Sequence, residues 1–285
     1  MKTWLLVDLN YLAHRAKHST GDMSHEGLST GVAFGVLRDL KDLAERYPPY
    51  RMVLCLDYRG RKIRQNMLPT YKSSREAKKT EEDRERDVIF RQEVDRLWED
   101  LLPRVGYRNF VEQQGYEADD ILAGYAAKIP KGHDAIIVTG DEDLWQCLTH
   151  DVMWYSPGTG RLLDSRTFYQ EWGVDPIQWA HVKALAGCKT DDVPGIAGIG
   201  EKSAAGWFNG KLKVGSKKWE LISENIGIVQ QNLPLVKLPL PGLRLPAPVP
   251  DELSDEGWQS VLVELGIVKL RQSKDGKVVR PATLF

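Results

Sequence analysis

Acidic residues follow or end three short apolar runs of this 285-residue chain, and this pattern constrains the fold more than any other feature. The runs are TWLLVDL (3–9), RMVLCLD (51–57) and AIIVTGDED (135–143). They are rich in Val, Ile and Leu and too short for helices, so they predict buried parallel strands. Together with a fourth strand pattern at 152–156 and helical patterns between the runs, they predict an α/β fold with right-handed crossovers.

Nine acidic residues lie where a strand or a helix is expected to meet a loop. They are Asp8, Asp57, Glu117, Asp119, Asp120, Asp141, Asp143, Asp191 and Asp192. Ligands of open parallel sheets bind beyond the carboxyl ends of the strands, so we expect these acids to converge there. Carboxylates gathered in one cleft repel each other unless cations lie between them, and hard oxygen ligands favour Mg²⁺. The pattern therefore predicts metal-assisted phosphate chemistry.

Two of the acidic motifs also have a purely structural explanation. GYEADDILAGYAA (115–127) places three acids at the start of a helix, where acids favour the helix dipole. In VTGDEDLWQCL (138–148), Asp141 and Asp143 share one side if the strand continues, whereas Asp141 is an N-cap if a helix begins there. The number of acids at the other strand ends favours a functional role for both motifs.

A basic segment contrasts with these acids, although the formal net charge of the whole chain is −1. Residues 51–79 include nine Lys or Arg residues, Lys78 and Lys79 among them, against Asp57 and Glu76. An acidic metal site beside a basic flank is the electrostatic layout that a phosphodiesterase needs. A solvated basic helix is the alternative explanation.

The later part of the chain shows clear helix signals. A helix is predicted from about Thr80, its N-cap, to Leu102, with Asp83 three residues after the cap and with charged first turns. Another is predicted from Asp175-Pro176 to about Gly187. The prolines that follow Leu233 predict an extended connector, and a short helix is predicted at 254–265.

A glycine-rich loop is expected between two helices at IAGIGEKSAAGWF (196–208), which Val193-Pro194-Gly195 precedes. It differs from a nucleotide-hydrolysing P-loop because Glu201 comes before Lys202-Ser203 and no strand precedes the loop. Such a loop offers backbone N–H groups to a DNA phosphate, or allows tight helix packing. The candidate phosphate-binding residues are Gly195, Gly198, Gly200, Lys202 and Ser203.

Membrane and disulfide signals are weak. No apolar stretch approaches the roughly 18 residues of a membrane span, and the apolar run that ends at Asp8 is too short for a signal peptide. Cys55, Cys147 and Cys188 have no paired spacing, which favours a reduced, cytoplasmic protein. His14 and His18 have no third ligand with zinc spacing.

Five motifs together resemble a known family. They are LVDLNYLAHR, LPTYKSSRE, GYEADD, VTGDEDLWQ and GCKTDDVPGIAGIGEKSA, spread over about residues 3–210. In order and spacing they resemble the flap endonuclease and 5′→3′ exonuclease family, which includes the 5′-nuclease domain of bacterial DNA polymerase I and free-standing phage enzymes. The charged segment from Arg84 to Asp100 is most similar to the free-standing phage type.

The resemblance implies a particular architecture. Residues 1–174 would form a PIN-like or resolvase-like nuclease core, a mostly parallel central sheet flanked by helices, with a helical arch at about 59–102. Residues 175–285 would form a helical DNA-binding subdomain, with a helix–three-turn–helix at about 176–210, the Pro-rich connector and a tail.

The resemblance also implies two-metal catalysis with Mg²⁺, for which Mn²⁺ would substitute. The first ion would be held by Asp8, Asp57, Glu117, Asp119, Asp120 and Asp141, directly or through water. Asp141, Asp143 and Asp191 would hold the second ion, with Asp8 and Asp141 counted as catalytic. Lys72 and Arg75 would approach the scissile phosphate, Tyr71 would stack on a terminal base, and the glycine loop would bind duplex DNA and K⁺.

One position departs from the family pattern, which usually reads Gly-Asp-x-x-Asp-Asn in the last acidic motif. Here Cys188 follows Gly187, and Asp192 stands where the family has Asn. A thiol in place of an acid removes a hard ligand from the second metal position. We therefore expect Asp192 to restore the charge, and to join the metal ligands if the loop bends suitably.

The expected function is a structure-specific, Mg²⁺-dependent 5′-nuclease. It would remove 5′ ends, flaps and RNA primers in replication, acting on DNA or an RNA–DNA hybrid as a monomer in the cytoplasm, or the host cytoplasm for a phage enzyme. Two alternatives stay open. A PIN-type ribonuclease would share the sheet and the acids but lack the arch and the glycine loop. A non-catalytic branched-DNA-binding protein would keep those two features but have damaged acids.

Overall fold

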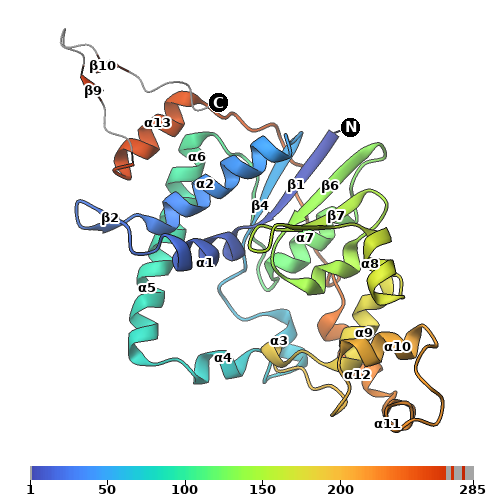
Figure 1. Cartoon of the computed structure of the whole chain (residues 1–285). Helices are drawn as coiled ribbons and strands as arrows, with labels where there is room; N and C mark the ends of the chain where they lie inside the picture. The colour runs from blue at the N-terminus through green and yellow to red at the C-terminus, as the bar shows by residue number, and fades with distance from the viewer. Residues whose placement is uncertain (1, 268–270, 273–277, 280–285) are drawn as a thin grey trace. The chain divides into compact units, whose positions relative to one another are not determined.

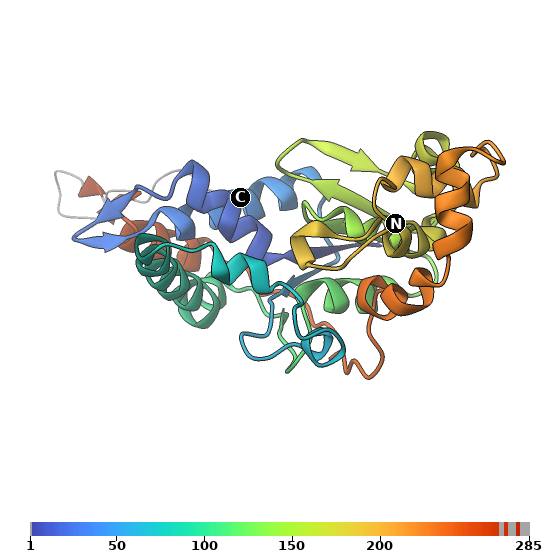
Figure 2. The ribbon, with the colours of Figure 1, turned by 90° about the horizontal axis from the view of Figure 1, so that it is seen from below.

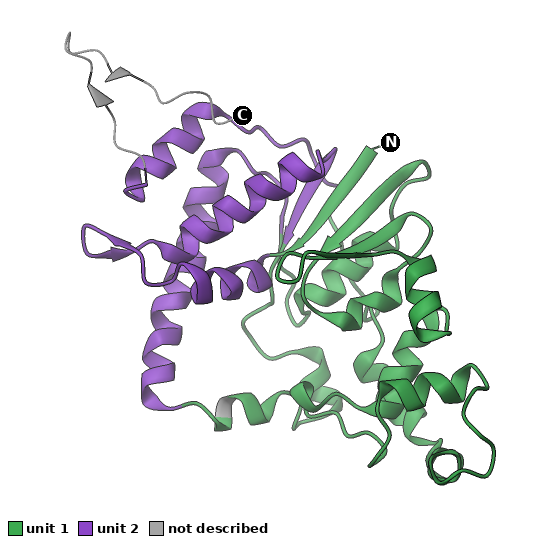
Figure 3. Ribbon diagram, viewed as in Figure 1, with its two compact units in different colours: residues 1–8, 55–79, 111–246 green, residues 9–54, 80–110, 247–285 purple. Residues whose placement is uncertain are grey.

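The computed structural model describes residues 2–267, 271–272 and 278–279, and the chain packs into two compact units (Figure 3). The first unit is built from residues 1–8, 55–79 and 111–246. The second is built from residues 9–54, 80–110 and 247–285. The predicted domain boundary between residues 174 and 175 lies inside the first unit and stays a prediction.

A sheet lies at the centre of the first unit (Figure 1). Its strands follow the order β1 (Lys2–Asp8), β6 (His133–Val138), β7 (Val152–Ser156) and β8 (Arg161–Leu163). The first two pairings are parallel, whereas β8 returns antiparallel to β7 as a short hairpin. The mostly parallel sheet is therefore confirmed, and β8 is an addition that the apolar pattern did not predict.

Helices cover this sheet and continue beyond it. α7 (Ala118–Ala126) packs against β1 and β6, and a short 3-10 helix, η2 (Glu142–Cys147), follows β6. Next along the chain come α8 (Ser165–Trp172), η3 (Pro176–Gln178) and α9 (Trp179–Ala186). Trp145 of η2 is buried, and its ring contacts those of Trp154, Phe168, Trp172 and Trp179. This aromatic cluster ties α8 and α9 to the strands.

The remaining helices of the first unit are short. α3 (Ile63–Met67) and α4 (Ser73–Ala77) lie in the basic segment, and η4 (Lys189–Asp191) follows α9. α10 (Glu201–Phe208) and α12 (Ile228–Val236) both pack on α9, and α11 (Lys217–Asn225) packs on α10, so these helices gather at one end of the unit (Figure 2).

Two helix boundaries test the sequence predictions. The helix from Pro176 to Gly187 is confirmed as η3 followed by α9, which ends at Gly187 with a φ of +74°. The connector was predicted to begin after Leu233, and this was wrong, because α12 includes Pro234 and continues to Val236. Leu235 and Val236 are buried beside Ala184 of α9, and this contact holds the last turn in place.

The second unit is mainly helical. α1 (Leu9–Ser19) packs on α2 (Gly31–Arg46), and α2 packs on α5 (Glu81–Arg96). Helix α5 runs on through a π-helical turn, η1 (Leu97–Leu101), into α6 (Leu102–Val105). Thr80 caps α5 and accepts the N–H of Asp83, so the predicted helix start is confirmed. The predicted arch, at about 59–102, is divided between the units after Lys79 and stays a prediction.

Short strands and a last helix complete the described residues. β2 (Ser24–His25) pairs with β3 (Leu28–Ser29), and α13 (Asp255–Glu264), capped by Ser254, packs on α6. β4 (Arg51–Cys55) and β5 (Phe110–Val111) each have residues in both units, and β9 (Arg271–Gln272) pairs with β10 (Val278–Val279). Among the described residues, no helix is long and apolar enough to span a membrane.

A buried carboxylate from α5 completes the start of α2. Thr30, the N-cap of α2, makes no side-chain cap hydrogen bond. Glu93 instead accepts the N–H of Val32 at 3.0 Å and the hydroxyl of Ser29 at 2.7 Å. Orphan N–H groups at a helix start need such acceptors, so Glu93 fastens α5 to α2.

We expect Glu93→Ala to lower the free energy of unfolding by about 1–3 kcal/mol, because it leaves the Val32 N–H without its acceptor. Glu93→Gln retains a carbonyl acceptor and should lose less. The exposed Glu82 of the same helix is the control, and Glu82→Ala should stay within about 0.5 kcal/mol. Urea unfolding measures all three, and equal losses for Glu93→Ala and Glu82→Ala would contradict this role.

Candidate metal centre and nucleic-acid interface

Four predicted metal ligands come together in the first unit. Asp8 ends β1 and accepts the Thr139 hydroxyl at 2.8 Å, while Asp57 accepts the N–H of Ala118 at 2.7 Å at the start of α7. Burial first, and then the negative charges of Asp141, Asp8 and Asp57, raise the pKa of Asp119 well above its usual value. We call Asp8, Asp57, Asp119 and Asp141 the first acidic group.

Asp141 satisfies both of the explanations that its sequence left open. A 3-10 helix begins after it, and its carboxylate accepts the N–H of Asp143 at 2.7 Å, as an N-cap does. The same carboxylate faces other acids. Enclosure by the protein, then the negative charges of Asp143 and Asp191, raise its pKa to about 6, against the lowering effects of the Asp143 N–H and Lys183. Capping and acid clustering therefore coexist here.

A second acidic group consists of Asp143, Cys188 and Asp191. One donor atom from each residue lies within 4.8 Å of the others, a spacing at which all three could hold one ion. The thiol of Cys188 also lies 3.0 Å from the hydroxyl of Thr190. The position where the family has an acid thus faces the other two ligands.

Asp192 lies apart from this group. Its carboxylate accepts the N–H of Ser74 at 2.8 Å, near the start of α4, and its φ is +57°. Hydrogen bonds from Ser74, and then the charges of Lys78 and Arg75, lower its pKa. The structure therefore uses Asp192 to anchor α4, and its expected compensation for Cys188 stays a prediction without support from these contacts.

Basic side chains lie among the acids. Lys72 Nζ is 2.5 Å from Glu117 and 3.8 Å from Asp191, and Arg75 is 2.7 Å from Asp191. Burial alone would lower the pKa of Lys72, but the charges of Glu117 and Asp191 raise it, so the ammonium stays charged. The two predicted phosphate-contacting residues therefore belong to the same site as the acids.

Sequence reasoning missed Arg64, which changes the interpretation of Asp120. The Arg64 guanidinium is 3% exposed and donates to both oxygens of Asp120, at 2.6 and 2.9 Å. The Leu240 N–H also donates to Asp120, at 2.9 Å. Both oxygens of Asp120 are thus engaged by protein groups, and its predicted role as a metal ligand gains no support. Arg64 had appeared only as one charge of a basic segment.

Lys183 was missed as well, although the sequence did contain a signal. It is the one lysine in the mostly apolar helix WAHVKALA, and it is 8% exposed. Its ammonium lies 2.8 Å from Asp143 and 2.8 Å from Glu201. A single buried charge in an apolar helix is costly unless paired, so its presence was a sign of acidic partners.

Tyr71 has an environment different from the predicted one. Its ring is 3% exposed and packs with Ala184, Val193 and Leu235, so the ring has no free face for a base. Its hydroxyl donates to Glu117 at 2.9 Å. The predicted stacking stays untested, and these contacts instead give Tyr71 the task of orienting Glu117.

The glycine loop contains both kinds of glycine that its sequence allowed. A Cβ on Gly195 would meet the carbonyl oxygen of Ala186 at 2.0 Å, so this glycine serves tight packing on α9. Gly198 has a φ of +81°, and Gly200 is the N-cap of α10. A Cβ on either of these two would meet nothing within 4 Å, which leaves the backbone there open to a ligand.

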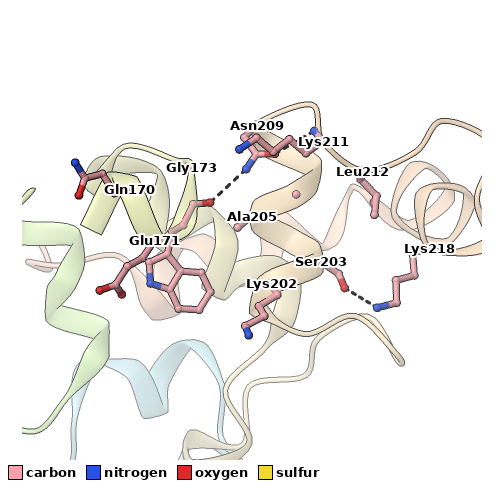
Figure 4. A pocket seen from close by; sticks show the side chains of 12 residues that line it. Gln170, Glu171, Gly173, Lys202, Ser203, Ala205, Asn209, Lys211, Leu212 and Lys218 are labelled. Atoms are coloured by element: carbon pink, nitrogen blue, oxygen red, sulfur yellow. Dashed lines mark hydrogen bonds between the residues drawn. The ribbon is translucent and has the colours of Figure 1, made fainter. Parts of the chain in front are cut away.

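A cationic pocket of about 660 Å³ lies beside α10 (Figure 4). Lys202, Lys211 and Lys218 line it, together with Glu171. Lys218 donates to the hydroxyl of Ser203 at 2.7 Å. The predicted phosphate-binding pair Lys202 and Ser203 thus gains two further lysines, Lys211 and Lys218.

The two acidic groups fit divalent cations by their donor chemistry. All the donors except the Cys188 thiol are carboxylate oxygens, which hard cations prefer. Burial, and after it the charges of neighbouring acids, raise the pKa values of Asp119 and Asp141, and a bound cation would favour their charged forms. Such clustering of perturbed acids is typical of functional sites.

Comparison with known proteins gives consistent similarities. The family model described as 5'-3' exonuclease, N-terminal resolvase-like domain, matches residues 3–173. The 5'-3' exonuclease of Bacillus subtilis strain 168 is 32% identical over 209 residues, covering 70% of this chain and 67% of that protein. The thermostable DNA polymerase I of Thermus filiformis is 35% identical over 205 residues, which is 71% of this chain but only 23% of the polymerase. The chain thus spans under a quarter of the polymerase relatives.

Solved structures agree on the fold. A T5 5'-exonuclease with bound zinc superposes with a TM-score of 0.71 at 24% identity, covering 84% of this chain and 90% of that one. A T5 D15 flap endonuclease in complex with DNA and metal ions gives a TM-score of 0.69 at 25% identity, with the same coverage. Because the family model spans more than half of its residues, and because a relative is 32% identical over most of both chains, the chain belongs to the 5'-3' exonuclease family with an N-terminal resolvase-like domain.

Proposed function

We propose that this chain is a divalent-cation-dependent phosphodiesterase that cuts DNA at 5′ ends and 5′ flaps. The observation that carries the proposal is the convergence of the two acidic groups with Lys72 and Arg75. Arg75 and its partner Asp191 are 116 positions apart in the sequence. Membership of the 5'-3' exonuclease family supports it. A solved T5 flap endonuclease, similar in fold, was crystallised with DNA and metal ions.

The two acidic groups are the proposed ligands of two Mg²⁺ ions, with Mn²⁺ as a substitute. Bound there, the ions would lower the pKa of the attacking water and stabilise charge on the attacking and leaving oxygens. Glu117, held by Tyr71 and Lys72, would support the first group, and Asp120 would keep Arg64 in place beneath it. The thiol of Cys188 gives the second group a softer set of ligands than the first group, which contains carboxylates.

Lys72 and Arg75 are the proposed contacts to the scissile phosphate. Both now pair with carboxylates that would serve as ligands or support ligands. Once those carboxylates are occupied, the two cations can turn towards an incoming phosphate without leaving the site. Lys72 has a φ of +57°, a conformation that non-glycine residues rarely adopt. Such strain is typical of positions that a site requires.

The open backbone of the glycine loop, with Lys202, Lys211 and Lys218 beside it, is the proposed grip on duplex DNA. Contacts of this kind address phosphates, so recognition would depend on strand geometry and not on base sequence. We further propose that the enzyme acts on RNA–DNA hybrids and removes RNA primers in replication. The glycine loop would bind K⁺, and the enzyme would work as a monomer in the cytoplasm.

Changing Asp141 to Asn should reduce cleavage of a labelled 5′-flap DNA by about a hundredfold or more, because it removes a proposed ligand. Flap binding should stay nearly normal. Asp134, near the start of β6, the strand that precedes Asp141, is the matched control, and Asp134→Asn should cut normally. Near-normal cleavage by Asp141→Asn would show the ligand assignment to be wrong. A wild-type protein that binds the flap with Mg²⁺ but never cuts it would favour the non-catalytic alternative.

Changing Lys72 to Ala should lower the single-turnover cleavage rate by about a hundredfold, since a cation beside the scissile phosphate acts on developing charge. The dissociation constant for duplex should rise by only about fivefold or less. Lys202→Ala should do the reverse, weakening the duplex more than the chemistry. If Lys72→Ala slows cleavage and weakens duplex binding by the same factor, Lys72 is an ordinary phosphate contact.

Changing Gly198 to Val should weaken binding to all duplexes alike, by about tenfold or 1.4 kcal/mol, because a side chain blocks approach to the loop backbone. Gly132 is a closely matched control, since it has the same φ of +81° and equally open surroundings. Both variants should lose about 1–2 kcal/mol of stability from the left-handed conformation. Only Gly198→Val should weaken the binding of duplex DNA. Equal binding by the two variants would remove the loop from the interface.

A further inference from the structure

One buried lysine joins the second acidic group to the helix that follows the glycine loop. Lys183 lies on α9, and its ammonium is 2.8 Å from Asp143 and 2.8 Å from Glu201. Asp143 belongs to the second acidic group, and Glu201 is the first residue of α10, directly after Gly200. The ammonium is therefore shared by two carboxylates, one in the proposed cation site and one beside the proposed duplex-binding loop.

How strongly Lys183 is held by Asp143 and by Glu201 depends on whether another cation neutralises Asp143. Two carboxylates share one ammonium, so their net charge is negative, and each holds Lys183 only in part. A divalent cation on Asp143 would take over that carboxylate and repel the ammonium beside it. Lys183 would then be held mainly by Glu201. Lys183 is only 8% exposed, so solvent screens these interactions less than at the surface.

Glu201 occupies a sensitive position for an anionic ligand. The start of a helix, with its exposed N–H groups, favours phosphate, and Gly198 and Gly200 leave the approach open. A carboxylate in the first turn opposes the same phosphate. The Glu201 side chain is 30% exposed, so its charge is felt at the surface unless Lys183 neutralises it. How firmly Lys183 holds Glu201 thus sets how well the loop accepts a phosphate.

We propose that Lys183 is a positioning residue that couples cation binding at the second acidic group to the grip of the glycine loop on duplex DNA, through Glu201. The inference rests on the proposed function, because it takes the second acidic group as a cation site and the loop as a phosphate site. By thermodynamic linkage, duplex binding raises the affinity for the cation by the same factor that the cation raises the affinity for duplex.

The test measures duplex affinity with and without a divalent cation. The probe is a fluorescent DNA dumbbell, closed by a loop at each end, which has no 5′ end to cut. Anisotropy gives its dissociation constant in EDTA and in saturating Mg²⁺ at constant ionic strength. The ratio of the two constants is the coupling factor, and for the wild-type protein we expect about tenfold.

Two substitutions should abolish the coupling with opposite effects in EDTA. Lys183→Met removes the ammonium, leaves Glu201 charged and should weaken binding in both conditions. Glu201→Gln removes the opposing charge and should already tighten binding in EDTA. In both variants the coupling factor should fall to the smaller value that Mg²⁺ produces without the Lys183–Glu201 link. Lys183→Arg keeps a cation at this position and should retain part of the wild-type coupling factor. Lys202→Met, which removes an adjacent exposed lysine, should weaken binding in both conditions and leave the ratio unchanged.

The outcomes separate this inference from the proposed function. If Lys183→Met and Glu201→Gln keep the wild-type ratio while the wild type cuts 5′ flaps, the coupling is wrong and the nuclease assignment stands. If both variants weaken binding in EDTA, Lys183 and Glu201 only support the fold, and the coupling is again wrong. Wild-type protein that fails to bind duplex at all would overturn both.

Discussion

Repulsion between converging carboxylates is the constraint on which the rest of the structure depends. Parallel strands end at the same edge of a sheet, so the acids that follow them come close together whatever else the chain does. Burial first, and then the negative charges of neighbouring acids, raise the pKa values of Asp119 and Asp141. The fold tolerates this repulsion because four cations, Arg64, Lys72, Arg75 and Lys183, lie among the acids.

These cations fall into two kinds, which divide the work. Arg64 is fully enclosed and makes two hydrogen bonds to Asp120, a geometry that fixes a carboxylate and removes it from ligand chemistry. Lys72, Arg75 and Lys183 instead hold acids with single ammonium or guanidinium contacts. Under the proposed function, the first kind would build the site, and the second kind would hold the acids together until metal and phosphate bind.

The departure at Cys188 has a clear structural setting. The thiol faces Asp143 and Asp191, so Cys188 stands at the position of a ligand. Its sulfur is a softer donor than the carboxylate oxygen that the family has there. Asp192, which restores the charge in sequence, is turned to the backbone of Ser74 and anchors α4. Two residues of one motif can thus serve different elements: Cys188 faces the second acidic group, and Asp192, with a φ of +57°, contacts α4.

The layer pattern and the identity of most acids could be predicted from the residues alone. Short apolar runs ended by Asp predicted parallel strands and a shared edge, and Thr80 and Pro176 predicted the helix starts, because these signals are local. The pairings between distant side chains could not be predicted in this way. Arg64 with Asp120, Lys183 with Asp143 and Glu201, and the burial of Tyr71 join residues far apart in the chain. Their charges and rings look the same in sequence whether they face solvent, DNA or one another, and packing alone selects among these.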